Sequence, residues 1–454
     1  MRDTTRRGFL MGCSTAIAGI ASARFTNLVF ADPLAVPESD VLIVLFLRGG
    51  MDGLSFVMPT GGSDRTLYET ARPALKIPTS GTGAALSLGN LDGTPFGLHP
   101  AATGLHELYQ DGHLAFVHAA GLTVPSRSHF DNQAQMELGT PGVGSTTSGW
   151  LTRHFLTAPG LPAETPMLQR VAVSSTLQTS WLADTNVVAF ANRDDFLFNT
   201  GPSAWRDAQK TSLRNILELQ SATDPRYAQG LVSLDASAFL EQNVPPLTSY
   251  VPANGAVYPT GSFGDTMKLT AQLLKLDMGL RAATIDLGGW DTHNGQGTAA
   301  DGQYFWEKIQ EMSAALAGFY LDLDGSGATA FAGRVTVVVM SEFGRRLREN
   351  NDVGTDHGHG GVITVLGGQV AGGRLFGTWP GLASEQLYDH ADLAITTDYR
   401  RVIAEILARR MGNPNWSQIF PGYAGYSPLG LVGSTVFADG FEGGQTSGWS
   451  HGSP

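Results

Sequence analysis

Five short apolar runs along the chain predict β-strands that are buried on both faces. They occupy residues 41–47, 114–118, 282–287, 335–340 and 362–366. Between them, leucines recur at helical spacing over 269–280, and apolar residues do the same over 306–319. Strands and helices in alternation are typical of a doubly wound α/β fold, in which helices sandwich a mostly parallel sheet. We predict this fold class for residues 39–431.

Polar side chains follow three of these runs at the point where each strand ends. Asp52 lies in a glycine-rich loop after the first run, Asp291 and His293 follow the third, and Glu342 follows the fourth. Ligands of doubly wound sheets bind beyond the carboxyl ends of the strands. These side chains are therefore expected to face one site. Asp52 has a second interpretation, because an aspartate at this place can also cap the next turn.

Two segments stand apart from the strand–helix pattern. Residues 192–259 hold a predicted helix over 203–220 and then a proline-rich stretch. We predict that this segment is an insertion that forms a helical cap over the site. Residues 432–454 are rich in glycine and serine, which predicts a flexible, solvated tail.

The first residues look like a twin-arginine export signal. Arg6 and Arg7 precede Gly8-Phe9-Leu10 and a weakly apolar stretch that runs to Ala23. A signal over residues 1–31 implies the twin-arginine export machinery as a partner and a periplasmic or secreted location. A lipoprotein anchor at Cys13 and an ordinary N-terminal helix are the alternatives. Because no other segment reaches membrane-spanning length, we expect no stable membrane insertion.

Composition narrows the class of partner. The 454 residues include 29 Lys and Arg against 41 Asp and Glu, a formal net charge of −12. This balance speaks against nucleic acid, which binds to clustered basic surfaces. Cys13 is the only cysteine, so no intrachain disulfide forms and stability must come from core packing or bound metal.

The densest group of candidate ligands is Asp356-His357-Gly358-His359 in a glycine-rich loop before the fifth run. Carboxylate oxygen and imidazole nitrogen together suit zinc or a similar divalent ion. Zinc is therefore the first candidate for a cofactor, with calcium, magnesium and manganese as alternatives. The predicted metal ligands are Asp52, Asp291, His293, Glu342, Asp356, His357 and His359.

A hydroxyl-rich segment precedes a predicted helix that runs through Glu137. A hydroxyl at the start of a helix is usually a cap. The same place also lets the positive helix end hold an anion beside the hydroxyl, as a metal-activated serine nucleophile requires. The candidate catalytic residues are Ser126, Arg127, Ser128 and His129.

Together these motifs resemble the alkaline phosphatase superfamily, which includes phosphodiesterases and sulfatases. They are most similar to a twin-arginine-exported bacterial family of unknown function in that superfamily. Asp52-Gly53 is similar to its metal-binding Asp-Gly pair, and Pro125-Ser126-Arg127-Ser128 to its nucleophile segment, which favours Ser128. Asp291 with His293, and Asp356-His357-Gly358, are similar to the ligands of its two metals.

Two departures from that pattern leave the assignment of ligands open. Asp291 and His293 are three residues closer together than the corresponding pair in phosphatases. In a second register, Glu342 and Phe343 stand where the superfamily has a ligand and a histidine, and the 356–359 loop supplies a later histidine. A site with one metal, another metal or no activity fits these departures.

The resemblance implies hydrolysis of phosphate or sulfate esters, small molecules or polymers, with attack by Ser128 and with Arg127 on the non-bridging oxygens. The rival hypothesis is an inactive binding or assembly protein of the cell envelope, whose acidic loops hold structural calcium. A carbohydrate hydrolase is a third alternative, for which no carboxylate pair stands out.

Overall fold

The computed structural model describes residues 40–142, 146–161, 168–198, 202–220, 225–326 and 330–433. The export signal predicted over residues 1–31, and all but the first two residues of the predicted tail, lie outside these ranges. Within them, every helix is too short or too polar to cross a membrane.

The described residues form a nine-stranded central sheet with the order β13-β5-β12-β9-β1-β8-β6-β7, to which β14 adds by pairing with β5. The central strand β1 pairs in parallel with β8 and β9, whereas β12 is antiparallel to both β9 and β5. All five predicted strands are present, as β1 (Val41–Leu47), β5 (Leu114–Gly121), β8 (Ala282–Leu287), β9 (Val335–Ser341) and β12 (Gly361–Gly367). The remaining, shorter strands of this sheet are β6 (Arg170–Ala172), β7 (Val188–Ala189), β13 (Arg374–Phe376) and β14 (Thr397–Asp398).

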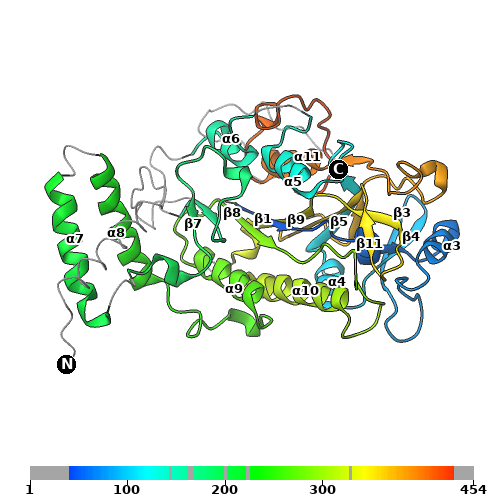
Figure 1. The fold of residues 1–454 in the computed structure, drawn as a ribbon, viewed down its shortest axis with the longest axis horizontal. Helices are drawn as coiled ribbons and strands as arrows, with labels where there is room; N and C mark the ends of the chain where they lie inside the picture. Colours follow the sequence, from blue (N-terminus) through cyan, green and yellow to red (C-terminus); the bar gives the residue numbers. More distant parts are fainter. Residues whose placement is uncertain are drawn as a thin grey trace, which may run out of the picture.

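Helices cover both faces of this sheet (Figure 1). On one face lie α4 (Thr103–Gln110), α9 (Ser262–Lys275) and α10 (Tyr304–Leu323), and on the other α5 (His129–Leu138), α6 (Trp150–Thr157) and α11 (Tyr399–Arg409). Alternate side chains of β1 enter two separate cores, with Ile43 and Leu45 against the first set of helices and Val44 and Phe46 against the second. This confirms the prediction of a mostly parallel sheet between two layers of helices.

Smaller elements flank the sheet. They are α2 (Gly53–Phe56), α3 (Gly62–Ala71), α12 (Trp416–Ile419), a sheet of β2 (Val57–Pro59), β3 (Leu86–Leu91) and β4 (Thr94–Leu98), and a hairpin of β10 (Arg345–Glu349) and β11 (Thr355–His357).

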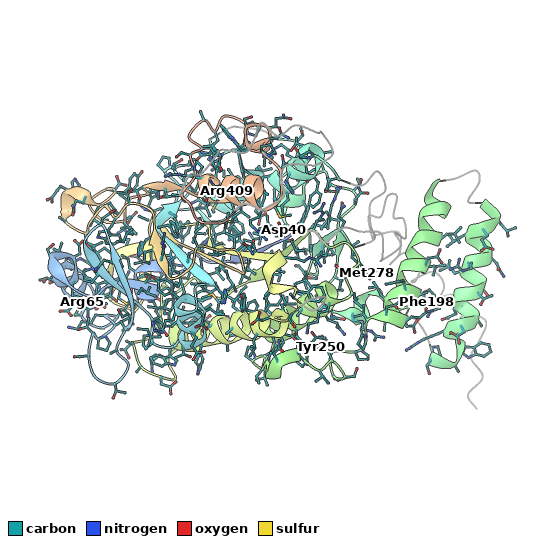
Figure 2. The ribbon with its side chains drawn as sticks, turned by 180° about the vertical axis from the view of Figure 1, so that it is seen from behind. Asp40, Arg65, Phe198, Tyr250, Met278 and Arg409 are labelled. Atoms are coloured by element: carbon teal, nitrogen blue, oxygen red, sulfur yellow. The ribbon has the colours of Figure 1, made fainter. Side chains whose placement is uncertain are left out.

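The predicted insertion is helical, but its position differs from the predicted cap. Helices α7 (Arg206–Gln220) and α8 (Pro225–Asn243) stand beyond β7 at one end of the molecule, whereas β11 lies toward the other end (Figure 1). Phe198, Leu213, Leu217 and Leu234 form a small core of their own there, and Figure 2 shows Phe198 beside this pair. The two helices bury apolar side chains against each other, and Leu240 of α8 packs into the main core. The pair stands at the end of the molecule away from β11 (Figure 1).

Three histidines are buried as neutral imidazoles. Burial lowers the pKa of His99 and of His154 to about 3, and that of His118 to about 4. The Nδ1 of each ring accepts a hydrogen bond, from Ala101 N at 3.2 Å, Asn413 Nδ2 at 3.0 Å and Ala119 N at 2.8 Å respectively. A proton on Nδ1 would break these bonds, so the fold requires the neutral ring.

We expect the free energy of unfolding to fall as the pH drops below about 6.5. In that range these histidines bind protons in the unfolded chain but stay neutral in the folded protein. Each ring contributes at most about 1.4 kcal/mol per pH unit between its unfolded and its folded pKa. Urea denaturation at pH 7, 6 and 5 measures this slope. His118→Gln should make the slope shallower, since it removes one of the buried rings with a lowered pKa, a set that also includes His359. An unchanged slope would contradict the assignment.

Candidate metal centre

Three imidazole rings converge on one carboxylate oxygen beyond the carboxyl edge of the sheet. The Nε2 atoms of His129, His293 and His357 lie 3.5, 3.4 and 3.4 Å from Asp291 Oδ1. One ligand atom from each of His129, Asp291 and His357 lies within 4.8 Å of the others, a spacing that a metal ion can bridge. The structure thus brings together Asp291 and His357 from the predicted metal ligands with His129, which the sequence placed among the catalytic residues. His293 contacts the same Asp291 oxygen but is not part of this group of three.

Strand direction explains why these residues meet. Asp291 and His293 follow the carboxyl end of β8, next to that of β1. A parallel β12 would carry the preceding loop, with His357, to the opposite edge of the sheet. Because β12 is antiparallel to β9, its amino end lies beside the carboxyl end of β9 instead. The β10–β11 hairpin then folds back with Arg345 paired to His357, which places the ring at the centre.

The outer nitrogen of each ring has a protein acceptor. His129 Nδ1 donates to Glu342 Oε1 (2.7 Å), His293 Nδ1 to Asp356 Oδ1 (3.1 Å), and His357 Nδ1 to the Arg127 carbonyl (2.7 Å). In this tautomer each Nε2 presents its lone pair to the centre, as in metal-bound histidines. His129 Nε2 is buried and has no hydrogen-bond partner among the described residues. A metal ion would satisfy this lone pair.

Glu342 therefore orients His129, in place of the predicted contact with a metal. Its carboxylate is fully buried and also accepts hydrogen bonds from Gln133 Nε2 (2.7 Å) and Gly49 N (2.9 Å). Burial raises the pKa of Glu342, but the hydrogen bonds from His129 and Gln133 outweigh burial and hold it below its usual range. The same contact raises the pKa of His129. Asp356 has the corresponding position behind His293.

A buried guanidinium completes the centre. Arg345 Nη2 donates to Asp291 Oδ1 (2.7 Å), while its other groups donate to the carbonyls of Gly50 (2.6 Å) and Thr355 (2.8 Å). Burial alone would raise the pKa of Asp291, yet the hydrogen bond and charge of Arg345 hold it below its usual value. Asp291 is therefore an anion. Arg345 donates to its Oδ1, so Oδ2 is the carboxylate oxygen without that contact.

Asp52 does not join this cluster. Its Oδ2 and Oδ1 accept hydrogen bonds from Arg72 at 2.6 and 2.9 Å, and Gln296 donates to Oδ2 at 2.7 Å. Both charged side chains are fully buried. Asp52 also caps α2 by accepting from Ser55 N, as the alternative interpretation of the sequence had it. Arg72 lies on a different element, and no local pattern around Asp52 pointed to it.

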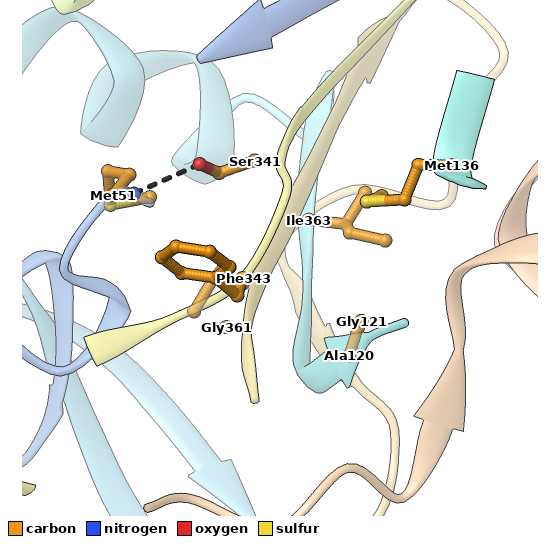
Figure 3. A pocket seen from close by; sticks show the side chains of 9 residues that line it. Met51, Ala120, Gly121, Met136, Ser341, Phe343, Gly361 and Ile363 are labelled. Atoms are coloured by element: carbon orange, nitrogen blue, oxygen red, sulfur yellow. Dashed lines mark hydrogen bonds between the residues drawn. The ribbon is translucent and has the colours of Figure 1, made fainter. Parts of the chain in front are cut away.

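His359 and Phe343 also lie outside the set of ligands. The His359 ring is buried, stacks on Tyr388 with centroids 4.2 Å apart, and has its pKa lowered to about 4 by burial. The Phe343 ring lies 4.8 Å from the rings of both His129 and His357, and it forms an apolar wall of the centre. Figure 3 shows Phe343 on the side of a small cavity that Met51, Met136 and Ile363 also line.

The predicted nucleophile segment lies beside the centre. Ser128 is the N-cap of α5, and its Oγ accepts from Asp131 N at 3.4 Å. It stands between Arg127, whose carbonyl contacts His357, and His129. Ser126 Oγ accepts from Ser128 N at 3.2 Å. The Arg127 guanidinium binds Asp392, so the structure does not present it to a substrate as the sequence analysis expected.

The fold and this centre define an α/β protein with a candidate metal site at the carboxyl edge of a mostly parallel sheet. The chain belongs to the family described as "Protein of unknown function (DUF1501)", which matches residues 39–418. No curated protein sequence matches the chain. Among solved structures, an alkaline phosphatase from the Antarctic bacterium TAB5 is similar, with 11% sequence identity over 72% of this chain and 92% of that chain. Its TM-score of 0.28 is too low to support any inference about fold or function.

Asp52→Asn should lower the free energy of unfolding by about 3–5 kcal/mol, because it leaves the buried Arg72 charge unpaired. Urea denaturation measures this loss. Asp277→Asn, which breaks a partly exposed pair with Arg334, is the matched control and should cost about 1 kcal/mol or less. Zinc affinity should be unchanged in both variants. A stable Asp52→Asn protein that has lost zinc would show that Asp52 is a ligand.

Proposed function

We propose that this chain is a metal-dependent hydrolase of phosphate or sulfate esters, with one divalent ion held by His129, Asp291 and His357. His293, which contacts the same Asp291 oxygen, is the proposed fourth ligand. The observation that carries the proposal is the convergence of three Nε2 atoms whose Nδ1 atoms are each engaged by the protein. The leader predicted from Arg6 and Arg7 adds the proposal that the enzyme acts outside the cytoplasm. Its substrate would be a small-molecule or polymer ester.

The ligands present suit zinc. Three neutral imidazoles and one carboxylate are the nitrogen and oxygen donors that zinc takes, whereas calcium and magnesium prefer oxygen. We propose one ion for two reasons. The Asp52 carboxylate is already paired with Arg72, and Phe343 packs against two of the ligand rings. When bound, such an ion supplies Lewis acidity to an ester oxygen and lowers the pKa of a hydroxyl that approaches it.

Ser128 is the proposed nucleophile. Its hydroxyl would displace the alcohol of the ester and form a seryl ester, with the serine proton leaving on the alcohol. Water would then release the acid and restore Ser128. The first turn of α5 supplies N–H groups that lack helical partners, and these would hold the anionic oxygens in place of Arg127. Ser126 would keep Ser128 in place through the hydrogen bond to its backbone N–H.

Phe343 favours a second candidate function. Its apolar ring against His129 and His357 leaves less room for a charged substrate group than a polar side chain would. In that alternative, the metal stabilises a binding or assembly protein and Ser128 serves only as the cap of α5. Turnover by the purified protein separates the two functions.

Purified chain should bind one equivalent of zinc, and chelation should lower the melting temperature, because an ion that binds only the folded state stabilises that state. His129→Ala should weaken zinc binding strongly, since it removes one of four ligands. His359→Phe preserves the stacked ring on Tyr388 and should bind zinc as the wild type does. Isothermal titration gives both affinity and stoichiometry. A wild-type chain that binds no divalent ion would end the proposal, and two equivalents would refute the single site.

Ser128→Ala should reduce turnover of a phosphate or sulfate ester by about 10⁴-fold or more, as when other nucleophiles are removed. Ser126→Ala is the matched control, since the two serines stand two residues apart and Ser128 N donates to Ser126 Oγ. It should lose far less activity, because it removes a hydrogen bond that positions Ser128 but leaves the Ser128 hydroxyl in place. Neither change should lower stability by more than the roughly 0.5–2 kcal/mol of a lost helix cap. Full activity in Ser128→Ala would move the attack to water.

A further inference from the structure

The Arg127 side chain is anchored away from the metal centre. Its Nε and Nη2 atoms both donate to Asp392 Oδ2, at 3.0 and 2.6 Å, and Nη2 also donates to Asp389 Oδ2 at 3.2 Å. The Asp392 side chain is wholly buried, whereas that of Asp389 is 60% exposed. The two carboxylates therefore depend on Arg127 to different degrees. The buried charge of Asp392 needs a charged partner, whereas the exposed carboxylate of Asp389 is solvated without one.

The loop that presents Asp392 is built in an unfavourable backbone conformation. Asp389 and His390 have φ angles of 50° and 55°. Residues other than glycine adopt this left-handed backbone conformation uncommonly. Tyr388 and Asp392 exchange two backbone hydrogen bonds, at 2.9 and 3.0 Å, and close the loop. The Tyr388 ring in turn stacks on His359. Strain of this kind persists only where the surroundings impose it, and it is found mostly at functional sites.

The other end of the anchored residue contacts the centre. The Arg127 carbonyl accepts the Nδ1 hydrogen of His357 at 2.7 Å, and the opposite ring nitrogen lies 3.4 Å from Asp291. Glu342, which orients His129, directly follows the buried strand β9. The Arg127 carbonyl belongs to the 124–128 loop, so its direction depends on what fixes that loop. The guanidinium–Asp392 pair ties this loop to the 388–392 loop, and Asn132 Nδ2 ties it to α5 through the Ser126 carbonyl.

We propose that Arg127 and Asp392 form a positioning pair, in which the buried carboxylate fixes the Arg127 carbonyl and thereby the tautomer and direction of the metal-facing His357 ring. The same tie holds the neighbouring Ser128 at the start of α5. This assigns Arg127 a role without substrate contact. It rests on the metal centre proposed above, and it adds a residue, Asp392, that touches no candidate ligand.

The deciding variant is Arg127→Met, which keeps most of the side-chain length and removes both donors. Zinc affinity, measured by competition with a chromogenic chelator, should fall about 10- to 100-fold, the usual effect of losing a group that orients a ligand. Arg127→Lys should recover part of the loss, because lysine keeps the charge but offers a single point contact. Asp389→Asn is the matched control and should bind zinc as the wild type does.

A double-mutant cycle tests whether the two residues act as one unit. Asp392→Asn alone should weaken zinc binding, and the double variant with Arg127→Met should be no weaker than Arg127→Met alone. Circular dichroism and thermal melting confirm that each protein is folded before its affinity is compared. Additive losses in the cycle would overturn the pairing.

A measurement on metal-free protein separates this inference from the proposed function. The ¹⁵N shifts of the His357 ring report which nitrogen carries the proton, and the wild type should show Nδ1–H. Arg127→Met should lose this tautomer preference while Asp389→Asn keeps it. If the wild type binds no zinc, the proposed metal centre fails and the tautomer still decides the positioning role. A folded Arg127→Met protein with the wild-type tautomer and zinc affinity would refute it.

Discussion

The rest of the site depends on the hydrogen bonds that the Arg345 guanidinium donates to the surrounding loops. The guanidinium joins the loop after β1, through the Gly49 and Gly50 carbonyls, to the loop after β8, through Trp290 and Asp291, and to β11 through Thr355. Three loops that leave different strands thus share one planar cation. Its charge also keeps Asp291 ionised in a half-buried place. Without this cation the loops after β1 and β8 and the strand β11 would lose their common point of attachment.

The elements of the fold were predictable because their signals are local. A strand buried on both faces needs a mostly apolar run; β1 is apolar throughout, and β5, β8, β9 and β12 are apolar at most positions. The two long helices α9 and α10 follow from the spacing of their leucines and aromatic residues. The direction of β12 was not predictable from periodicity, since a parallel and an antiparallel strand carry the same apolar run. That direction decides which loop reaches the site.

The site was predicted only in part for a related reason. Asp291, His293 and His357 could be named because each lies next to a strand or in a dense polar motif. Glu342, Asp52 and Arg127 have their partners 213, 20 and 265 residues away along the chain, at His129, Arg72 and Asp392. Sequence spacing carries no record of such contacts. The residue types were therefore recognised, while the division between ligands and the groups that orient them was not.

The separate core of α7 and α8 has a consequence for local unfolding of the protein. Among the described residues, four buried side chains form the core between these helices and Leu240 of α8 joins the main core, whereas dozens fill each side of the main sheet. A subdomain with so few apolar contacts opens at a lower free energy than the body it is attached to. Its backbone amides should exchange with solvent long before those of β1 and β9, and a protease should cut there first. The centre beyond the sheet would stay intact while this end of the molecule unfolds and refolds.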